Sequence, residues 1–158
     1  MTSRSILIVL AAVLPIVAAA GAGQLATMPN LSPWYEGLQK PGFNPPNWIF
    51  GPVWTILYVL MGVAVWRIFQ APESQLRTIA LTAFFVQLTL NAAWSWLFFA
   101  RHSPLAGLIE IVPQWLSIVA TIVLFARLDV IAALCLTPLA LWVGFATLLN
   151  FAIWRLNG

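Results

Sequence analysis

The sequence predicts an all-α integral membrane protein that folds as one domain, residues 1–158, in a bundle of five transmembrane helices. Only 7% of its 158 residues are charged and 62% are hydrophobic, whereas a soluble domain carries about 25% charged residues. Five apolar stretches of about 20 residues or more are each long enough to cross a bilayer. Most links between them are a few residues long, which makes neighbouring helices run antiparallel.

The predicted spans are separated by short links that carry most of the charges. They cover residues 5–27, 48–69, 77–100, 105–126 and 130–155. An odd number of spans places the two termini on opposite sides of the membrane. The five spans together predict a multi-pass protein of a bacterial cell membrane or an organelle membrane. The basic residues divide four against three between the two sides, so the positive-inside rule does not set the orientation.

The first span has a competing interpretation as a secretory signal. Arg4, the apolar run and the small residues AAAGAG resemble such a signal with its cleavage site. The run continues through Leu25, however, and is long enough to span. Within it Ala18, Ala22 and Ala26 recur every four residues, a spacing that lets another helix approach closely.

The first link is the long one, and we expect a loop over residues 28–47. This loop contains the first half of the stretch WYEGLQKPGFNPPNWIFGPVWTILY, which runs from Trp34 to Tyr58. Its first half contains Pro41 and the pair Pro45-Pro46, which do not suit a helix interior. A loop with this much aromatic surface is expected to lie on a membrane interface or over the mouth of a pocket.

Three spans each carry one stripe of aromatic, amide or small side chains at a spacing of four residues. The stripes are Trp54 and Tyr58; Gln87, Asn91 and Ser95; and Trp142, Ala146 and Asn150. If they converge, they line a cavity with flat aromatic walls. Such a cavity suits a large planar apolar molecule whose polar rim hydrogen-bonds the three amides. In the alternative interpretation, the amides simply join helix to helix.

Other polar residues give weaker signals. Glu110 is an acid inside a span and is either a proton or cation site, a side chain that snorkels, or a partner of Arg101. His102 is expected to be solvated in its link, and Cys135 to be a small buried hydrophobe. We predict no metal site and no nucleic-acid patch. Without a catalytic triad, phosphate loop or carboxylate pair, chemistry would come from a ligand, light, oxygen or tryptophan.

The motifs resemble those of the translocator protein family, also called tryptophan-rich sensory proteins or peripheral benzodiazepine receptors. WYEGLQKP and NPPNWIFGPVWTILY are similar to the family's signature loop and second helix. QLTLNAAWSWLFF, residues 87–99, resembles its third-helix motif. PLALWVGFATLLNFAIWRLN, residues 138–157, resembles its fifth helix.

The resemblance implies a five-helix bundle, commonly a homodimer, with a ligand cavity beneath the first loop. The family binds porphyrins such as protoporphyrin IX, benzodiazepine- and isoquinoline-type drugs and, in many members, cholesterol, with no obligatory cofactor. By motif position, the eight stripe residues would line the cavity. Trp54 and Trp142 match the tryptophans implicated where porphyrin is degraded with light and oxygen. Leu139 and Phe151 depart from tyrosines of the family pattern, and Phe151 weakens the case for sterol binding.

Three functions follow from these expectations. The first is a membrane sensor or receptor that binds a tetrapyrrole, and we favour it because binding requires only the cavity. The second is an enzyme that degrades porphyrin under light through Trp54 and Trp142. The third is a transporter of porphyrin or sterol, which would favour internal repeats or broken helices, and the sequence has no obvious repeat.

Overall fold

The computed structural model describes residues 3–158, apart from the side chain of Arg4. It confirms the all-α fold class, with five helices long and apolar enough to cross a membrane. These are α1 (Ser3–Thr27), α2 (Asn47–Gln70), α3 (Gln75–Ser95), α4 (Pro104–Ala126) and α5 (Val130–Asn157). A π-helical turn, η3 (Trp96–Ala100), continues α3. The helix ends lie within two residues of the predicted spans.

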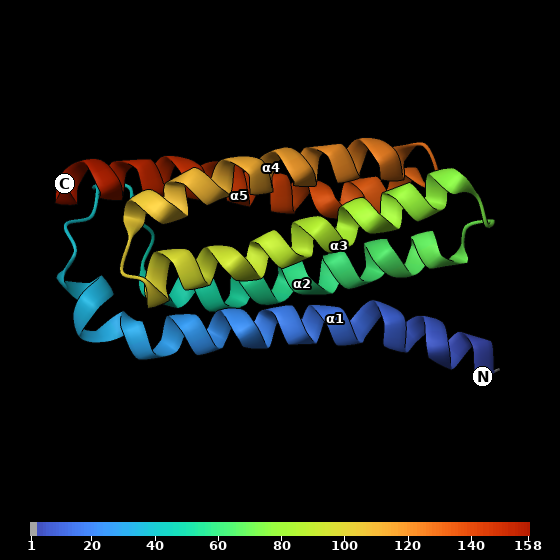
Figure 1. The fold of residues 1–158 in the computed structure, drawn as a ribbon, viewed down its shortest axis with the longest axis horizontal. Helices are drawn as coiled ribbons and strands as arrows, with labels where there is room; N and C mark the ends of the chain where they lie inside the picture. The colour runs from blue at the N-terminus through green and yellow to red at the C-terminus, as the bar shows by residue number, and fades with distance from the viewer. Residues whose placement is uncertain (1–2) are drawn as a thin grey trace.

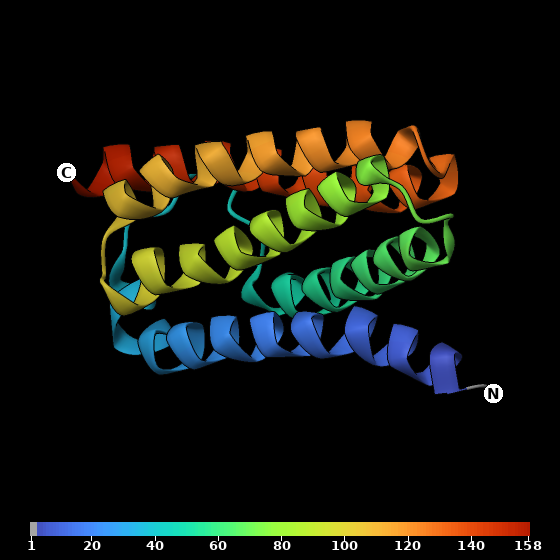
Figure 2. The same cartoon turned by 45° about the vertical axis from the view of Figure 1, so that its right-hand side comes forward.

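The helices lie side by side in three layers, with α1 at one side, α2 and α3 in the middle, and α4 and α5 at the other side (Figures 1 and 2). Accordingly, α1 packs on α2 and α3, while α4 packs on α3 and α5. The start of α1 and the end of α5 lie at opposite ends of the bundle (Figure 1), as an odd number of spans requires.

Side-chain caps determine where three of the helices begin. Ser74 accepts a hydrogen bond from the Arg77 amide at 3.1 Å, and Ser103 accepts one from Ala106 at 3.1 Å. Asp129 accepts from the Ala132 amide at 3.0 Å at the start of α5. Such caps satisfy backbone N–H groups that have no partner within the helix. They make the short links compatible with sharp reversals between long helices.

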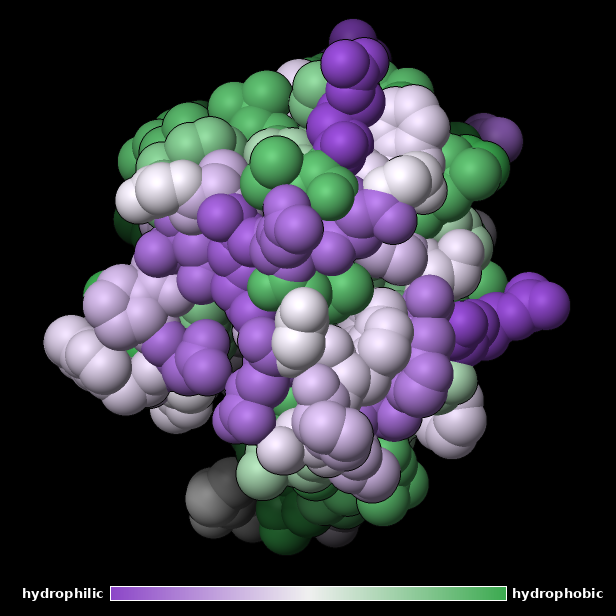
Figure 3. Space-filling model, turned by 90° about the vertical axis from the view of Figure 1, so that its left-hand side faces the viewer, coloured by the Kyte–Doolittle hydropathy of each residue, from purple (hydrophilic) through white to green (hydrophobic). Residues whose placement is uncertain are grey.

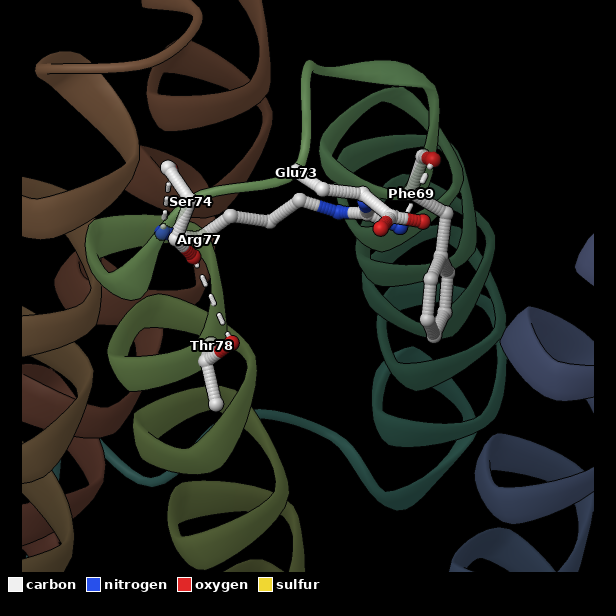
Figure 4. A network of polar contacts seen from close by, with 5 residues as sticks. All are labelled: Phe69, Glu73, Ser74, Arg77 and Thr78. Carbon is white, nitrogen blue, oxygen red and sulfur yellow. Dashed lines mark hydrogen bonds and ion pairs between the residues drawn. The ribbon is translucent and has the colours of Figure 1, made fainter.

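The link between α2 and α3 is fastened by Arg77 (Figure 4). Its guanidinium reaches back across the link and donates to the carbonyl oxygen of Phe69 at 3.1 Å, near the end of α2. The same group lies 3.7 Å from the carboxylate of Glu73. A cation is favourable there because the last carbonyls of a helix carry partial negative charge. The contact therefore holds the ends of α2 and α3 together.

The first link differs from the loop expected over residues 28–47, because its first half is helical. It contains a 3₁₀ turn, η1 (Met28–Asn30), and a π-helical turn, η2 (Leu31–Tyr35), and only residues 38–46 have no helical structure. Pro29 occupies the first turn of η1, where a missing N–H costs nothing. Ser32, which precedes a proline, is extended with φ −122° and ψ 134°.

The outer surface of the bundle is apolar along the lengths of all five helices. Leu14, Ile56, Val86, Leu116 and Leu141 are examples of large side chains between 48% and 71% exposed. Polar residues gather instead on the end of the bundle that carries the C-terminus, framed by apolar sides (Figure 3). In a lipid bilayer this distribution is the favourable one. The chain is therefore a multi-pass integral membrane protein.

The packing face of α1 differs from the predicted stripe of alanines. Ala26 is buried, but Ala18 is exposed and Ala22 is half-buried. The close approach occurs instead at Gly23, where a Cβ atom would lie 3.4 Å from the Ser95 hydroxyl on α3. Almost every position of this span is small or apolar, so sequence spacing alone did not identify its buried face.

Candidate functional site

A cavity of about 370 Å³ lies at the end of the bundle, beneath the segment that joins α1 to α2. Its walls come from all five helices and from the joining segment itself. The three predicted stripes converge here: Trp54 and Tyr58 on α2, Asn91 and Ser95 on α3, and Trp142, Ala146 and Asn150 on α5 all line it. That these residues bind a ligand remains a prediction.

Aromatic rings form most of the flat surface of the cavity. Trp54 and Tyr58 lie one turn apart on α2 with ring centroids 5.6 Å apart. Phe50 meets Trp142 edge to face at 5.8 Å and 72°, and so joins the α2 wall to the α5 wall. These pairs have the tilted and edge-to-face geometries that aromatic groups prefer. Ring contacts therefore connect neighbouring parts of the cavity wall.

Asn91 is an amide of the cavity wall whose hydrogen-bonding capacity is only partly used among the described residues. It is 4% exposed, and its Oδ1 accepts a hydrogen bond from the Tyr58 hydroxyl at 3.1 Å. Its Nδ2 is also buried and has no hydrogen-bond partner among the described residues. A buried donor without a partner costs about 1–3 kcal/mol. A ligand acceptor that reached this wall would recover part of that cost.

Asn150 behaves differently from Asn91, because its amide is already engaged within the bundle. Its Oδ1 accepts from the indole N–H of Trp94 at 3.1 Å, and its Nδ2 donates to the Pro104 carbonyl oxygen at 2.7 Å. Asn150 thus joins α5 to α3 and to the start of α4. For this residue the structure favours the helix-joining interpretation over hydrogen bonding to a ligand rim.

Gln87 is separate from the other seven stripe residues, because it does not line the cavity. It is fully buried, and its Nε2 lies 3.7 Å from the sulfur of Met61 on α2. It is four residues, or about 6 Å along the helix, deeper in the bundle than Asn91. The four-residue spacing correctly predicted that Gln87 faces the interior of the bundle. It did not show that the cavity ends before it reaches Gln87.

Several lining residues were missed by the sequence reasoning. Phe50 lies four residues before Trp54, and Trp94 lies three residues after Asn91, so helical spacing could have identified both. Gln114 on α4 also lines the cavity, although Glu110 was the residue singled out there. The contribution of α1, made by small residues such as Gly23, had no distinguishing pattern.

The segment over the cavity is held at two places. The Asn30 Oδ1 lies 2.7 Å from the His102 Nε2, and the His102 ring stacks on Trp34 with centroids 4.6 Å apart. Further along, the Asn157 side chain accepts from the backbone amide of Gln39 at 3.0 Å and donates to its carbonyl oxygen at 2.9 Å. His102 is exposed, as expected of a solvated residue in a link, and it also fastens the segment.

Two further residues differ from or refine the expectations. Both carboxyl oxygens of Glu110 are buried and have no partner among the described residues, so it does not pair with Arg101. Cys135 is half-buried against the core rather than fully buried. In the part of the chain that the structure describes, no three His, Cys, Asp or Glu side chains are grouped as a metal site would require.

Comparison with known proteins identifies the family. Residues 11–155 match the model of the TspO/MBR family. The chain is 44% identical over 137 residues to the tryptophan-rich protein TspO of Chlorobaculum tepidum, which covers 86% of this chain and 87% of that one. It is 39% identical over 142 residues to protein CrtK of Rhodobacter capsulatus, covering 89% of each. It is 34% identical over 126 residues to the human translocator protein, covering 78% of this chain and 75% of that one. The chain therefore belongs to the TspO/MBR family of membrane sensory and translocator proteins.

Proposed function

We propose that this protein is a membrane receptor that binds a tetrapyrrole, such as protoporphyrin IX, in the cavity beneath the segment joining α1 to α2. The observation that carries the proposal is the composition of the cavity wall. Trp54, Tyr58, Phe50 and Trp142 present rings from two facing helices, and Asn91 adds a buried amide donor that has no partner among residues 3–158. Flat rings with a few polar atoms complement a planar apolar macrocycle.

The cavity has the size of a small-molecule binding site. Its volume of about 370 Å³ is within the usual range of small-molecule pockets, which is about 300–1,000 Å³. Each well-placed aromatic contact contributes about 0.5–1.5 kcal/mol beyond the burial of apolar area. Several such contacts, together with the exclusion of a large apolar ring from water, would favour binding of a planar ring without a metal or charged group.

The same cavity is our proposed site for benzodiazepine- and isoquinoline-type drugs, which also carry fused aromatic rings and a carbonyl acceptor. Sterol binding receives less support, because Phe151 replaces the tyrosine of the sterol pattern and is 47% exposed on the outside of α5. We also propose that the protein forms a homodimer, on the basis of the family resemblance.

Degradation of porphyrin under light is the second candidate function. Trp54 and Trp142 both line the cavity, so an excited macrocycle bound there would contact two oxidisable indoles. The Trp142 ring contacts the Phe50 ring at 5.8 Å and the Phe145 ring at 5.6 Å, measured between centroids. These contacts would hold one indole beside a bound macrocycle, with which it would exchange an electron or proton.

Tryptophan fluorescence of the purified protein in lipid nanodiscs tests both candidates. Protoporphyrin IX is titrated in the dark, and the saturated complex is then illuminated with blue light in the presence of oxygen. Saturable quenching with an unchanged porphyrin spectrum on illumination supports the receptor. Saturable quenching followed by stoichiometric loss of porphyrin absorbance and a new product band supports the enzyme. Quenching that does not saturate would contradict both.

A further inference from the structure

Among the residues that the structure describes, the cavity wall contains no charged side chain. None of the lining residues within residues 3–158 is Lys, Arg, Asp, Glu or His, and the hydrogen-bonding groups of the wall are neutral amides, hydroxyls and indoles. An ionised carboxylate placed among them would lose its hydration without gaining an opposite charge, at a cost of several kcal/mol. A ligand that carries carboxylates can therefore place its ring in the cavity only if the carboxylates remain outside it.

One cation lies beside the wall at the end nearest water. The Lys40 ammonium is 4.6 Å from the ring centroid of Tyr35, and Tyr35 lines the cavity. Lys40 belongs to the joining segment, at the end of the bundle where polar residues gather (Figure 3). A planar ligand that entered ring first would thus bring its trailing edge toward this ammonium.

The Lys40 ammonium has one N–H donor left for an anion. It donates to the carbonyl oxygens of Glu36 at 3.2 Å and of Leu38 at 3.1 Å. An ammonium has three donors, so one remains. Both ion pairs among the described residues, which involve Arg67 and Arg77, lie at the opposite end of the bundle.

We propose that Lys40 binds a carboxylate on the edge of a planar apolar ligand whose ring occupies the cavity. The inference rests on the proposed function and specifies its ligand class: amphiphilic macrocycles with anionic groups on one edge, held with that edge toward water. Contact with Tyr35 and with two backbone carbonyls positions the ammonium before the ligand arrives, which reduces the ordering cost of binding.

Two probes with the same ring separate this role from a structural one. Protoporphyrin IX carries two carboxylates, and its dimethyl ester carries none. Both are titrated by fluorescence quenching into the parent chain and into Lys40→Met, Lys40→Arg and Arg155→Gln. Arg155 is an exposed cation in the last turn of α5, at the same end of the bundle, and serves as the matched control.

We expect Lys40→Met to weaken binding of protoporphyrin IX about fivefold, the effect of an ion pair worth about 1 kcal/mol. Binding of the dimethyl ester should change less than about twofold. Lys40→Arg should restore binding of the acid because it keeps the charge, and Arg155→Gln should leave both ligands unaffected. Added salt should weaken binding of the acid to the parent chain more than to Lys40→Met, because ions screen a partly exposed ion pair.

Two results would overturn the inference while leaving the proposed function intact. Equal loss of acid and ester in Lys40→Met would show that Lys40 only supports the segment. Unchanged binding of both would show that the carboxylates point elsewhere. If the parent chain bound neither probe, the proposed function itself would fail, and the inference with it.

Discussion

Replacing Gly107 by alanine should destabilise the protein, although alanine is the better helix former. A Cβ atom added at Gly107 would lie 2.9 Å from the Oδ1 of Asn150 and 3.0 Å from two side-chain carbons of Phe98. Neither neighbour can move easily. Asn150 is held by hydrogen bonds to Trp94 and Pro104, and the Phe98 ring stacks on Trp94 with centroids 4.9 Å apart.

The magnitude follows from two opposing terms. Overpacking a fixed contact costs about 1–3 kcal/mol, and these neighbours favour the upper half of that range. The gain in helix propensity offsets up to about 1 kcal/mol. The net loss is therefore about 1–2 kcal/mol, which would lower the Tm by about 2–8 °C for a chain of this size.

Gly21→Ala is the matched control. A Cβ atom at Gly21 on α1 would meet nothing within 4 Å, so only the propensity gain remains. The assay is thermal unfolding by circular dichroism in one detergent, with both variants beside the parent. Gly107→Ala should unfold at a lower temperature than the parent, and Gly21→Ala at the same or a higher temperature. Equal stability of the two variants would refute the close approach of α4 to Asn150.

Three further outcomes follow from the site and the helix ends. Asn91→Leu should weaken protoporphyrin IX binding by about 1–2 kcal/mol, measured by quenching, because one hydrogen bond is lost; unchanged affinity would assign Asn91 to helix packing alone. If porphyrin is degraded, Trp142→Phe should retain binding but slow the light-driven loss of porphyrin absorbance, and an unchanged rate would remove Trp142 from that role. The hydrogen bond from Arg67 at 2.8 Å lowers the pKa of the Asp129 carboxyl. Its stabilising effect should therefore be complete above the unfolded-state pKa of about 4 and disappear as the pH falls through the lower folded-state pKa. The Tm of Asp129→Asn should lack this decline, and identical Tm profiles against pH would contradict it.

The spans and the direction of the stripes could be predicted from the sequence because lipid imposes simple rules. A helix must be long and apolar, and its polar side chains must face other helices. Those rules placed Trp54, Asn91 and Trp142 on the inner face. They did not give depth along the axis, so Gln87 was grouped with the cavity residues although it lies below them.

Hydrogen-bond partners could not be predicted in the same way. Asn91 and Asn150 look alike in sequence, but the partners of Asn150 come from residues 56 and 46 positions away. Only the packed bundle shows that, among the described residues, the Asn150 amide has its hydrogen-bond partners and the Asn91 Nδ2 has none. The helical turns between α1 and α2 were not predicted either. Prolines disfavour a helix interior but suit a first helical turn, so their presence did not distinguish a loop from short helical turns.

The central claim, that a planar tetrapyrrole occupies this cavity, is tested most directly by filling it. Ala146 lines the cavity, so Ala146→Phe would place a ring where the ligand should lie, whereas Leu141→Phe changes a side chain that is 71% exposed on the outside of the same helix. In a quenching titration with protoporphyrin IX, the parent and Leu141→Phe should saturate alike, and Ala146→Phe should bind at least about tenfold more weakly, a loss of about 1.4 kcal/mol or more. Unchanged binding by Ala146→Phe would place the ligand outside the cavity and contradict the account.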